Sequence, residues 1–337
     1  MVRLKDIAAR AGVSVMTVSK VLREAPDVSN ATRVRVKVLA EQMGYVPNSV
    51  AQGLRSRTSK LFGLVISTSS NPIFSRIISA IEEASHESGY QLILCHTLNL
   101  PDREEAVIRR LLSRRIEGLF LSPVYRLSAT ASIYDELRRQ GLPTVILGHR
   151  APFCAQFVNV ETDDYGGSYQ AARHLLDCGH KRIAYLRGPV SSPAAQERFE
   201  GFRRALREAS IELDDKWVFS AGNTIEEGAT AASQLLSENP PITAVQCVND
   251  LCAIGAANLF LNQGLRIPED LSVFGFGNIL LSEYFRVPLS TVRQPKHRLG
   301  AAAMDIMKKM LRKELFEPRR LQSELVLRAS TASPSTV

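Results

Sequence analysis

The N-terminal segment AGVSVMTVSKVL, residues 11–22, carries side chains whose types and spacing suit contact with DNA bases. Gly12 and Ser14 predict a turn and a helix N-cap, because a serine hydroxyl can accept a hydrogen bond from the free N–H groups of a first helical turn. The side chains that the following helix would expose are Val15, Met16, Thr17 and Lys20. Methyl groups can contact thymine, a hydroxyl can bond a base or a phosphate, and a lysine can reach guanine O6 and N7 or a phosphate.

Positive charge is concentrated near the N-terminus. The chain of 337 residues has a formal net charge of +8, and residues 1–60 alone hold 11 Lys and Arg against four Asp and Glu. A basic head on a nearly neutral body indicates a polyanion as the partner of the head. A solvated basic arm is the alternative, but these charges stand among periodic apolar residues, so we expect the segment to fold.

The apolar spacing predicts short helices in residues 1–46. The first would end at Gly12, the second would begin after Ser14, and the third would run from near Ser29 to Gly44. Their expected core positions are Leu4, Ile7, Ala8, Ala11, Val18, Val21, Leu22, Val36, Leu39, Ala40 and Met43. The first two helices, joined by GVS, describe a helix-turn-helix, whose second helix enters the DNA major groove. A helical scaffold that binds no nucleic acid is the alternative.

From Leu61 onwards, short apolar runs alternate with amphipathic helical stretches. The expected strands are LFGLVIS, YQLILCHT, GLFLSP, PTVILG, RIAYLRG, AVQCVN and LSVFGFG, and helical stretches include residues 74–89 and 196–210. Strands that alternate with helices predict parallel sheets covered on both faces. Since the pattern restarts near Tyr165, we expect two similar α/β lobes facing a cleft, with ligands bound at the carboxyl ends of the strands.

Six motifs, in order, are similar to those of the LacI/GalR family of bacterial transcription regulators. They are LKDIAARAGVSVMTVSKVL, GYVPNSVAQGLR, RFEGFRRAL, VNDLCAIGAA, GLRIPEDLSVFGFGN and TVRQP. The resemblance covers essentially the whole chain and implies an all-α helix-turn-helix head and a two-lobed, periplasmic-binding-protein-like α/β ligand domain with parallel sheets. The sequence departs from the family pattern at Arg3, because a Thr or Ser usually occupies this position and caps the first helix. The lost cap bond suggests a phosphate contact for Arg3 instead.

The resemblance also implies domain boundaries and a hinge. The DNA-binding domain would span residues 1–46, the hinge helix and linker 47–60, and the effector-binding and dimerisation domain 61–331. The first lobe would hold about 61–162 and 291–321, and the second about 163–290 and 322–331. The hinge helix, Ser49–Arg55, is too short to be stable alone, and Gly53 costs it roughly 1 kcal/mol relative to alanine, so it should fold only when paired on DNA.

In the family, an apolar hinge residue is wedged into the minor groove, and Leu54 beside Ala51 matches that position. Packing of Leu54 against the lobes is the alternative. The expected DNA contacts are Arg3, Ser14, Val15, Met16, Thr17, Lys20, Ser29, Asn48, Ala51 and Leu54.

The family's effector cleft can be transferred residue by residue. The expected contacts are Phe74, Ser122, His149, Arg150, Arg198, Asn223, Asn249, Asp250, Gly277 and Gln294. The family commonly has acids at the positions of Gly148 and Gly277. Their loss, with Arg150 and Arg198 retained, favours uronates, aldonates or sugar phosphates over neutral sugars. Two alternatives remain: Asp250 faces the ligand, or Arg150 pairs with Asp163 or Asp164.

Other function classes find little support in the sequence. It has no P-loop, no His-Glu-x-x-His pair and no Gly-x-Ser-x-Gly elbow, so we expect no catalytic residues, metal or cofactor. The alternatives are a cytosolic carbohydrate-active α/β enzyme, such as a sugar kinase or isomerase, and a solute-binding protein. Since there is no signal peptide and no apolar run of ~20 residues, we expect a cytoplasmic protein with no membrane partner.

The five cysteines are scattered and are expected to be reduced and mostly buried. The expected function is a repressor that binds a near-palindromic operator as a homodimer under the control of a small-molecule effector, a sugar or sugar acid. The C-terminal segment LRASTASPSTV has no leucine heptads, so we expect no tetramer.

Overall fold

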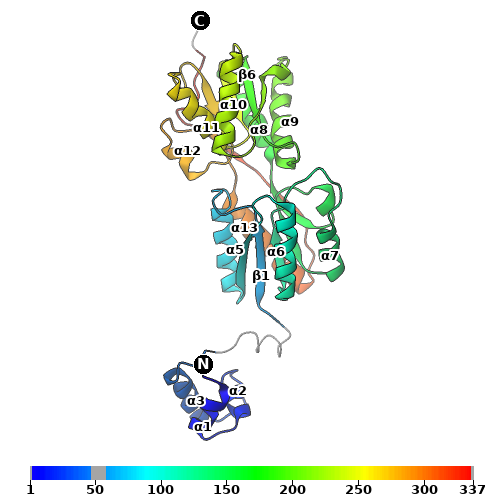
Figure 1. Cartoon of the computed structure of the whole chain (residues 1–337), viewed down its shortest axis with the longest axis vertical. Helices are drawn as coiled ribbons and strands as arrows, with labels where there is room; N and C mark the ends of the chain where they lie inside the picture. Colours follow the sequence, from blue (N-terminus) through cyan, green and yellow to red (C-terminus); the bar gives the residue numbers. More distant parts are fainter. Residues whose placement is uncertain (1, 47–57, 335–337) are drawn as a thin grey trace. The chain divides into compact units, whose positions relative to one another are not determined.

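The computed structural model describes residues 2–46 and 58–334, and the chain divides into two compact units, residues 1–59 and 60–337 (Figure 1). The predicted hinge contacts Asn48, Ala51 and Leu54 lie outside the described residues. No helix among the described residues is long and apolar enough to cross a membrane.

The head unit contains the helices α1 (Leu4–Ala11), α2 (Val15–Val21) and α3 (Asn30–Gln42). The Oγ of Ser14 accepts a hydrogen bond from the Thr17 N–H at 3.1 Å, and Ser29 caps α3 in the same way. Gly12 ends α1 with a φ of 65°, a conformation that favours glycine. The buried core is Ile7, Ala8, Ala11, Val18, Val21, Val36 and Ala40, while Leu4, Leu22, Leu39 and Met43 are half-buried against it.

The first lobe of the larger unit is built on a parallel sheet in the order β11-β5-β4-β3-β1-β2. Its strands are β1 (Leu61–Ile66), β2 (Gln91–His96), β3 (Gly118–Leu121), β4 (Thr144–Leu147), β5 (Val158–Thr162) and β11 (Arg319–Leu321). The helices are α5 (Ser75–Glu87), α6 (Pro101–Ser113), α7 (Ser132–Gln140) and α13 (Lys296–Arg312). Helices α5 and α13 bury apolar residues on one face of the sheet, and α6 and α7 do so on the other.

The second lobe has a parallel sheet in the order β7-β6-β8-β9. Its strands are β6 (Ile183–Arg187), β7 (Val218–Ser220), β8 (Ala244–Cys247) and β9 (Ser272–Phe274). Helices α8 (Asp164–Asp177) and α9 (Pro193–Glu208) cover one face, and α10 (Ile225–Glu238) and α11 (Asp250–Asn262) cover the other. The short helix α12 (Leu280–Tyr284) follows β9. The predicted α/β class with parallel sheets is therefore confirmed.

The chain passes between the lobes after β5, after β10 (Thr291–Arg293) and after β11 (Figure 1). Strand β10 pairs antiparallel with β12 (Glu324–Val326) in these crossing segments. The apolar runs did not reveal β5, β7, β10, β11 or β12. Most of these strands have only three residues, which is too short for a two-residue alternation to be recognised.

Candidate functional site

The first turn of α2 presents apolar side chains to solvent. Met16 is 68% exposed and Val15 is 45% exposed, while the opposite face of α2 is held in the core by Val18 and Val21. The Ser14 hydroxyl lies 2.9 Å from the Thr17 hydroxyl, so the cap also orients the threonine. This surface has the methyl groups and hydroxyls that base-edge contacts require.

The side chain of Arg3 does not cap α1. The N–H of Arg3 instead donates to Oδ2 of Asp6 at 2.8 Å, so the acid of the first turn bonds the N-cap backbone while the Arg3 side chain accepts no hydrogen bond from the described residues. The guanidinium of Arg3 is exposed and is not used for capping. The phosphate contact expected for Arg3 requires a guanidinium that is available in this way.

Lys20, the charged member of the exposed set, forms an ion pair with Asp27. A second pair joins Lys37 to Glu24 at 2.8 Å, so two of the four acids of the head are engaged in neutralising basic side chains. To reach a base or a phosphate, the ammonium of Lys20 must either break its ion pair with Asp27 or keep that pair while also contacting the DNA. Sequence reasoning did not predict this ion pair, because the turn between α2 and α3 is what brings Lys20 and Asp27 together.

A cavity of about 580 Å³ lies between the two lobes, and a smaller one of about 160 Å³ adjoins it and shares residues with it. Of the predicted contacts, those lining the larger cavity are Phe74, Ser122, Arg198, Asn223, Asn249 and Asp250. His149 and Gln294 line the smaller one, together with Gly148. Sequence reasoning missed several polar lining residues, among them Asn71, Asn99, Ser191 and Thr224, which lie in loops with no distinctive motif.

Two predicted contacts lie elsewhere. Neither Arg150 nor Gly277 is among the described residues that line these cavities. Arg150 is exposed and donates to the Ala155 carbonyl at 3.3 Å, and it forms no ion pair with Asp163 or Asp164, so that alternative does not apply either. Gly277 is buried with a φ of 137°, and a Cβ there would be strained and would approach Oδ2 of Asp250 to 3.3 Å. Its backbone conformation therefore favours glycine over an acid.

Arg198 is buried at the cleft wall and already has partners within the chain. Its Nε and Nη2 both lie 2.7 Å from Oδ1 of Asp164, and its Nη1 donates to the Val248 carbonyl at 2.7 Å. The guanidinium carbon lies 3.8 Å from the ring centroid of Phe276, which fixes the plane of the fork. Of the five guanidinium N–H donors, these contacts use three, and two remain for a ligand.

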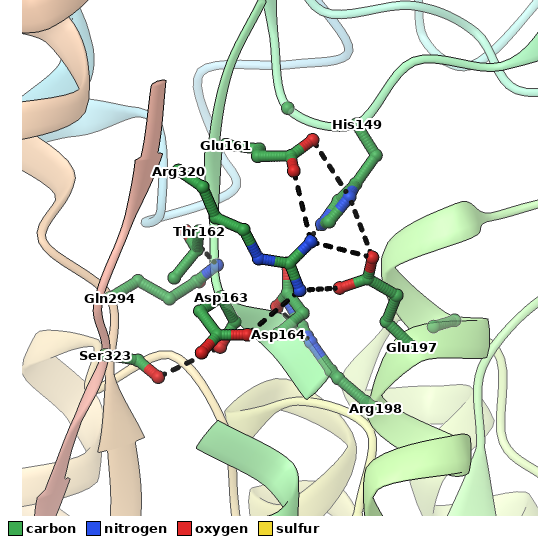
Figure 2. A network of polar contacts seen from close by, with 12 residues as sticks. His149, Glu161, Thr162, Asp163, Asp164, Glu197, Arg198, Gln294, Arg320 and Ser323 are labelled. Atoms are coloured by element: carbon green, nitrogen blue, oxygen red, sulfur yellow. Dashed lines mark hydrogen bonds and ion pairs between the residues drawn. The ribbon is translucent and has the colours of Figure 1, made fainter. Parts of the chain in front are cut away.

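The other oxygen of Asp164 reaches across to the first lobe. Nε2 of His149 lies 2.7 Å from Oδ2 of Asp164, and Nδ1 of the same ring lies 3.2 Å from Glu161 and 3.6 Å from Glu197 (Figure 2). His149 follows β4 in the first lobe, whereas Asp164 and Glu197 belong to helices of the second. The imidazole therefore bridges the lobes.

Arg320 forms a parallel bridge beside this ring (Figure 2). From β11 in the first lobe it contacts Glu197 at 2.7 Å, Asp163 at 2.9 Å and Glu161 at 3.2 Å. We call His149, Glu161, Asp163, Asp164, Glu197, Arg198 and Arg320 the interlobe network. It was not predicted as a unit, because its members come from four separate parts of the chain.

Charge in the network is set by mutual pairing. Burial by itself disfavours the protonated His149 ring, but hydrogen bonds and charge from Asp164 and Glu161 outweigh it and raise the pKa of His149 to about 9. Burial likewise opposes ionisation of Asp164, yet the charges of Arg198 and His149 hold its pKa below the usual value. These opposite shifts favour the ion pair between protonated His149 and the Asp164 carboxylate at neutral pH.

Asp250 lines the cleft but its oxygens are occupied by the protein. Oδ2 accepts hydrogen bonds from the Ile279 N–H at 2.9 Å and the Ser282 hydroxyl at 2.7 Å, and Oδ1 accepts one from Thr291 at 2.5 Å. Burial raises the pKa of this carboxyl despite these donors. Asp250 therefore holds the segment after β9 in place rather than presenting a free carboxylate.

The remaining predicted contacts have local roles as well. Asn249 caps α11 by accepting from the Cys252 N–H at 2.8 Å, and its Nδ2 lies 3.3 Å from the Asn223 carbonyl. Gln294 donates to Thr162 at 3.3 Å, while its Oε1 accepts no hydrogen bond from the described residues. No group of three or more His, Cys, Asp or Glu that could hold a metal is found in the described part of the chain.

Comparison with known proteins supports the resemblance. Residues 3–48 match the bacterial regulatory proteins of the lacI family, and residues 59–331 match the periplasmic binding proteins and sugar binding domain of LacI family. The HTH-type transcriptional repressor PurR of Vibrio vulnificus is 35% identical over 97% of this chain and 98% of its own length.

Two solved structures extend the similarity. The lac repressor dimer bound to operator and the anti-inducer ONPF superposes with a TM-score of 0.87, at 28% identity over 98% of this chain and 99% of that one. The transcriptional regulator CelR in complex with cellobiose has a TM-score of 0.74, at 30% identity over 98% and 100%. These relatives are transcription regulators, which confirms the expectation that the chain is not an enzyme.

The bridging histidine predicts a pH-dependent contribution to stability. Because the folded pKa of His149 is about 9 and its ordinary value is 6.5, its contribution is complete below about pH 6.5 and disappears as the pH rises through 9. The shift corresponds to roughly 3 kcal/mol at most. The difference in unfolding free energy between wild type and His149→Gln, from urea titrations, should therefore be larger at pH 6 than at pH 9.5.

His86→Gln provides the control, because this ring is exposed on α5 in the same lobe. Its unfolding free energy should follow wild type at both pH values. An equal difference between wild type and His149→Gln at pH 6 and pH 9.5 would show that the ring is not held protonated by the network.

Proposed function

Because the chain belongs to the LacI family of bacterial regulatory proteins and is a DNA-binding transcription regulator, we propose that it is a repressor acting as a homodimer on a near-palindromic operator. A small molecule in the interlobe cleft would control its operator affinity. The observation that carries this proposal is the coexistence of a capped helix with an exposed Val15–Met16 surface and a polar cleft between two lobes.

The proposed DNA surface is the first turn of α2 with Lys20. The apolar side chains would contact thymine methyl groups, and Lys20 would read a guanine after exchanging Asp27 for the base. The hinge contacts Asn48, Ala51 and Leu54, the phosphate contact of Arg3 and the DNA contact of Ser29 remain predictions. Two heads on one dimer require two half-sites related by the dimer axis, hence the near-palindromic operator.

The homodimer has a candidate surface on α12. Leu280, Leu281 and Tyr284 are 73%, 48% and 74% exposed, although the helix has only five residues. A cluster of large apolar side chains in solvent is typical of a protein–protein contact. A second copy of the chain is the proposed occupant, since the similar lac repressor was solved as a dimer on its operator.

The proposed effector is a polyhydroxylated molecule of the carbohydrate class. Among the described residues lining the larger cavity, Arg198 is the only Lys or Arg, and Asp164 already compensates its charge. This pairing weakens the case for an anion that was based on the glycines at positions 148 and 277. The Asn, Ser and Thr side chains of the walls suit hydroxyl groups, and the similar regulator CelR was solved with cellobiose.

Base reading by Lys20 predicts a position-specific loss. Lys20→Ala should weaken specific binding by ~1–3 kcal/mol, concentrated at one position of each half-site. The measurement is fluorescence anisotropy on an operator selected from a random duplex library and on its single-base variants. Asp27→Asn keeps the lysine and removes its acid, so it should retain or increase affinity. A uniform loss on all sequences, with the salt slope lower by about one unit, would instead make Lys20 a phosphate contact.

Filling the cleft should abolish effector control. Ala194, at the start of α9, lines both cavities and makes no side-chain hydrogen bond, so Ala194→Trp blocks the site without removing a polar contact. We expect a thermal-shift screen of sugars, sugar acids, sugar phosphates and purines to find a ligand for wild type, with about 2.7 kcal/mol of stabilisation at 100 times its dissociation constant. That ligand should change operator affinity of wild type and leave Ala194→Trp unaffected.

Ala129→Trp, in an exposed loop of the first lobe, is the matched control and should respond like wild type. Without the ligand, all three proteins should bind the operator equally. If Ala194→Trp still responds at wild-type ligand concentrations, the effector binds outside this cleft.

A further inference from the structure

A further cavity between the lobes, which shares Ile279 with the larger effector cavity and Gln294 with the smaller one, is lined by basic side chains. It has a volume of about 650 Å³, and its lining includes the basic residues Arg76, Arg293, Lys296 and Arg298, together with His297. The opposing carboxylates are Glu283 and Glu324, and Glu324 lies 3.7 Å from Arg293. Arg76 and Arg298 are exposed, and neither forms an ion pair with a described residue. The cavity therefore has an excess of positive charge.

Two helix N-termini meet at this cavity. Gly300 of α13 lies against the Ile77 carbonyl of α5, and further along Met304 lies 3.9 Å from Ser85, so the two helices run parallel with their first turns side by side. Neither N-terminus has a side-chain cap among the described residues, and neither first turn contains an acid. The partial positive charge of both helix ends is thus added to that of the side chains.

The charge placement at α13 is the reverse of the stabilising one. Acidic side chains stabilise a helix when they lie near its N-terminus. The first turn of α13 instead contains Lys296, His297 and Arg298. Lys296 is only 7% exposed, and burial together with the charges of Arg76 and Arg293 lowers its pKa to about 8, although Asp250 opposes this. An anion in the cavity would relieve this repulsion.

Two buried groups of the cavity wall retain hydrogen-bonding capacity. Nζ of Lys296 donates to the Gly277 carbonyl at 2.5 Å and the Asn278 carbonyl at 2.9 Å, which leaves one of its three N–H groups. Gln294 is 8% exposed, and its Oε1 accepts no hydrogen bond from the described residues. A ligand that combines an anionic group with a neighbouring hydroxyl or N–H would satisfy both.

We infer that this cavity is a second binding site, for a small phosphorylated or carboxylated molecule, which adjoins the effector cleft but holds its ligand through different basic side chains. The guanidinium groups of Arg76 and Arg298 would hold the anionic group, since planar forks of N–H donors match phosphate and carboxylate. The cavity wall joins α5 and α13 of the first lobe to Asn278 and Glu283 of the second. A bound anion would therefore contact both lobes and influence the angle between them.

The probe for this site is inorganic phosphate, titrated calorimetrically into the full-length protein at constant ionic strength maintained with chloride. In the double variant Arg76→Gln/Arg298→Gln, the phosphate dissociation constant should increase at least about ten-fold, because two charge-assisted contacts are lost. The phosphate dissociation constants of the two single variants should lie between those of wild type and the double variant. Both side chains are exposed, so circular dichroism should show an unchanged fold.

Two controls locate the binding. Arg138→Gln removes an exposed arginine from α7, and Ala194→Trp fills the effector cleft; both should bind phosphate within about two-fold of wild type. The inference is overturned if wild type binds no phosphate, if the double variant binds it as wild type does, or if Ala194→Trp loses it. Phosphate binding and the effector response are measured separately. If the phosphate experiments contradict the second site, the proposal of an effector cleft is therefore not affected.

Discussion

The arrangement of the ligand-binding unit depends on one buried carboxylate, that of Asp164. A charge removed from water is costly unless it is paired and hydrogen-bonded, so Asp164 can be ionised only while its partners stay in place. One partner, Arg198, belongs to the same lobe, and the other, His149, belongs to the opposite lobe. The electrostatic requirement of a single side chain therefore orients the Arg198 guanidinium at the cleft wall and also ties the lobes together.

This shared carboxylate connects ligand binding with lobe geometry. In the proposed function, a ligand bound by the remaining N–H groups of Arg198 would alter the partner of Asp164, and Asp164 in turn contacts the bridging histidine. Arg320 and Glu197 add a second bridge beside the first. A ligand can shift the lobes only as far as its affinities for two arrangements differ, typically by ~1–3 kcal/mol. A network of paired charges that spans the lobes could make the ligand's affinity differ between the two arrangements, because its contacts depend on how the lobes are arranged.

The sequence was sufficient where the relevant physics is local. Caps at Ser14 and Ser29, the turn at Gly12 and the apolar spacing predicted the helix-turn-helix, and apolar runs predicted β1, β2, β3, β4, β6, β8 and β9. It was insufficient where side chains meet across the fold. Arg320 and Glu197 are 123 positions apart, and Lys20 meets Asp27 through a turn whose path the spacing does not specify.

The errors in the cleft have the same origin. Arg150 was expected in the cleft because the family places that position there, but in a segment leaving a strand, neighbouring side chains point in different directions. The loss of acids at Gly148 and Gly277 suggested a positively charged cleft. Asp164, from a different segment, compensates Arg198, so counting charges at family positions did not give the charge of the assembled site.

The most direct test of the central role of Asp164 is a double-mutant cycle with His149→Gln and Asp164→Asn, measured by urea unfolding at pH 7. If the buried carboxylate ties the lobes through this ring, the two substitutions should be coupled by at least about 1 kcal/mol, since residues in one charged network are not additive. Additive losses, with a coupling energy near zero, would contradict the account, because the bridge would then contribute nothing to holding the lobes together.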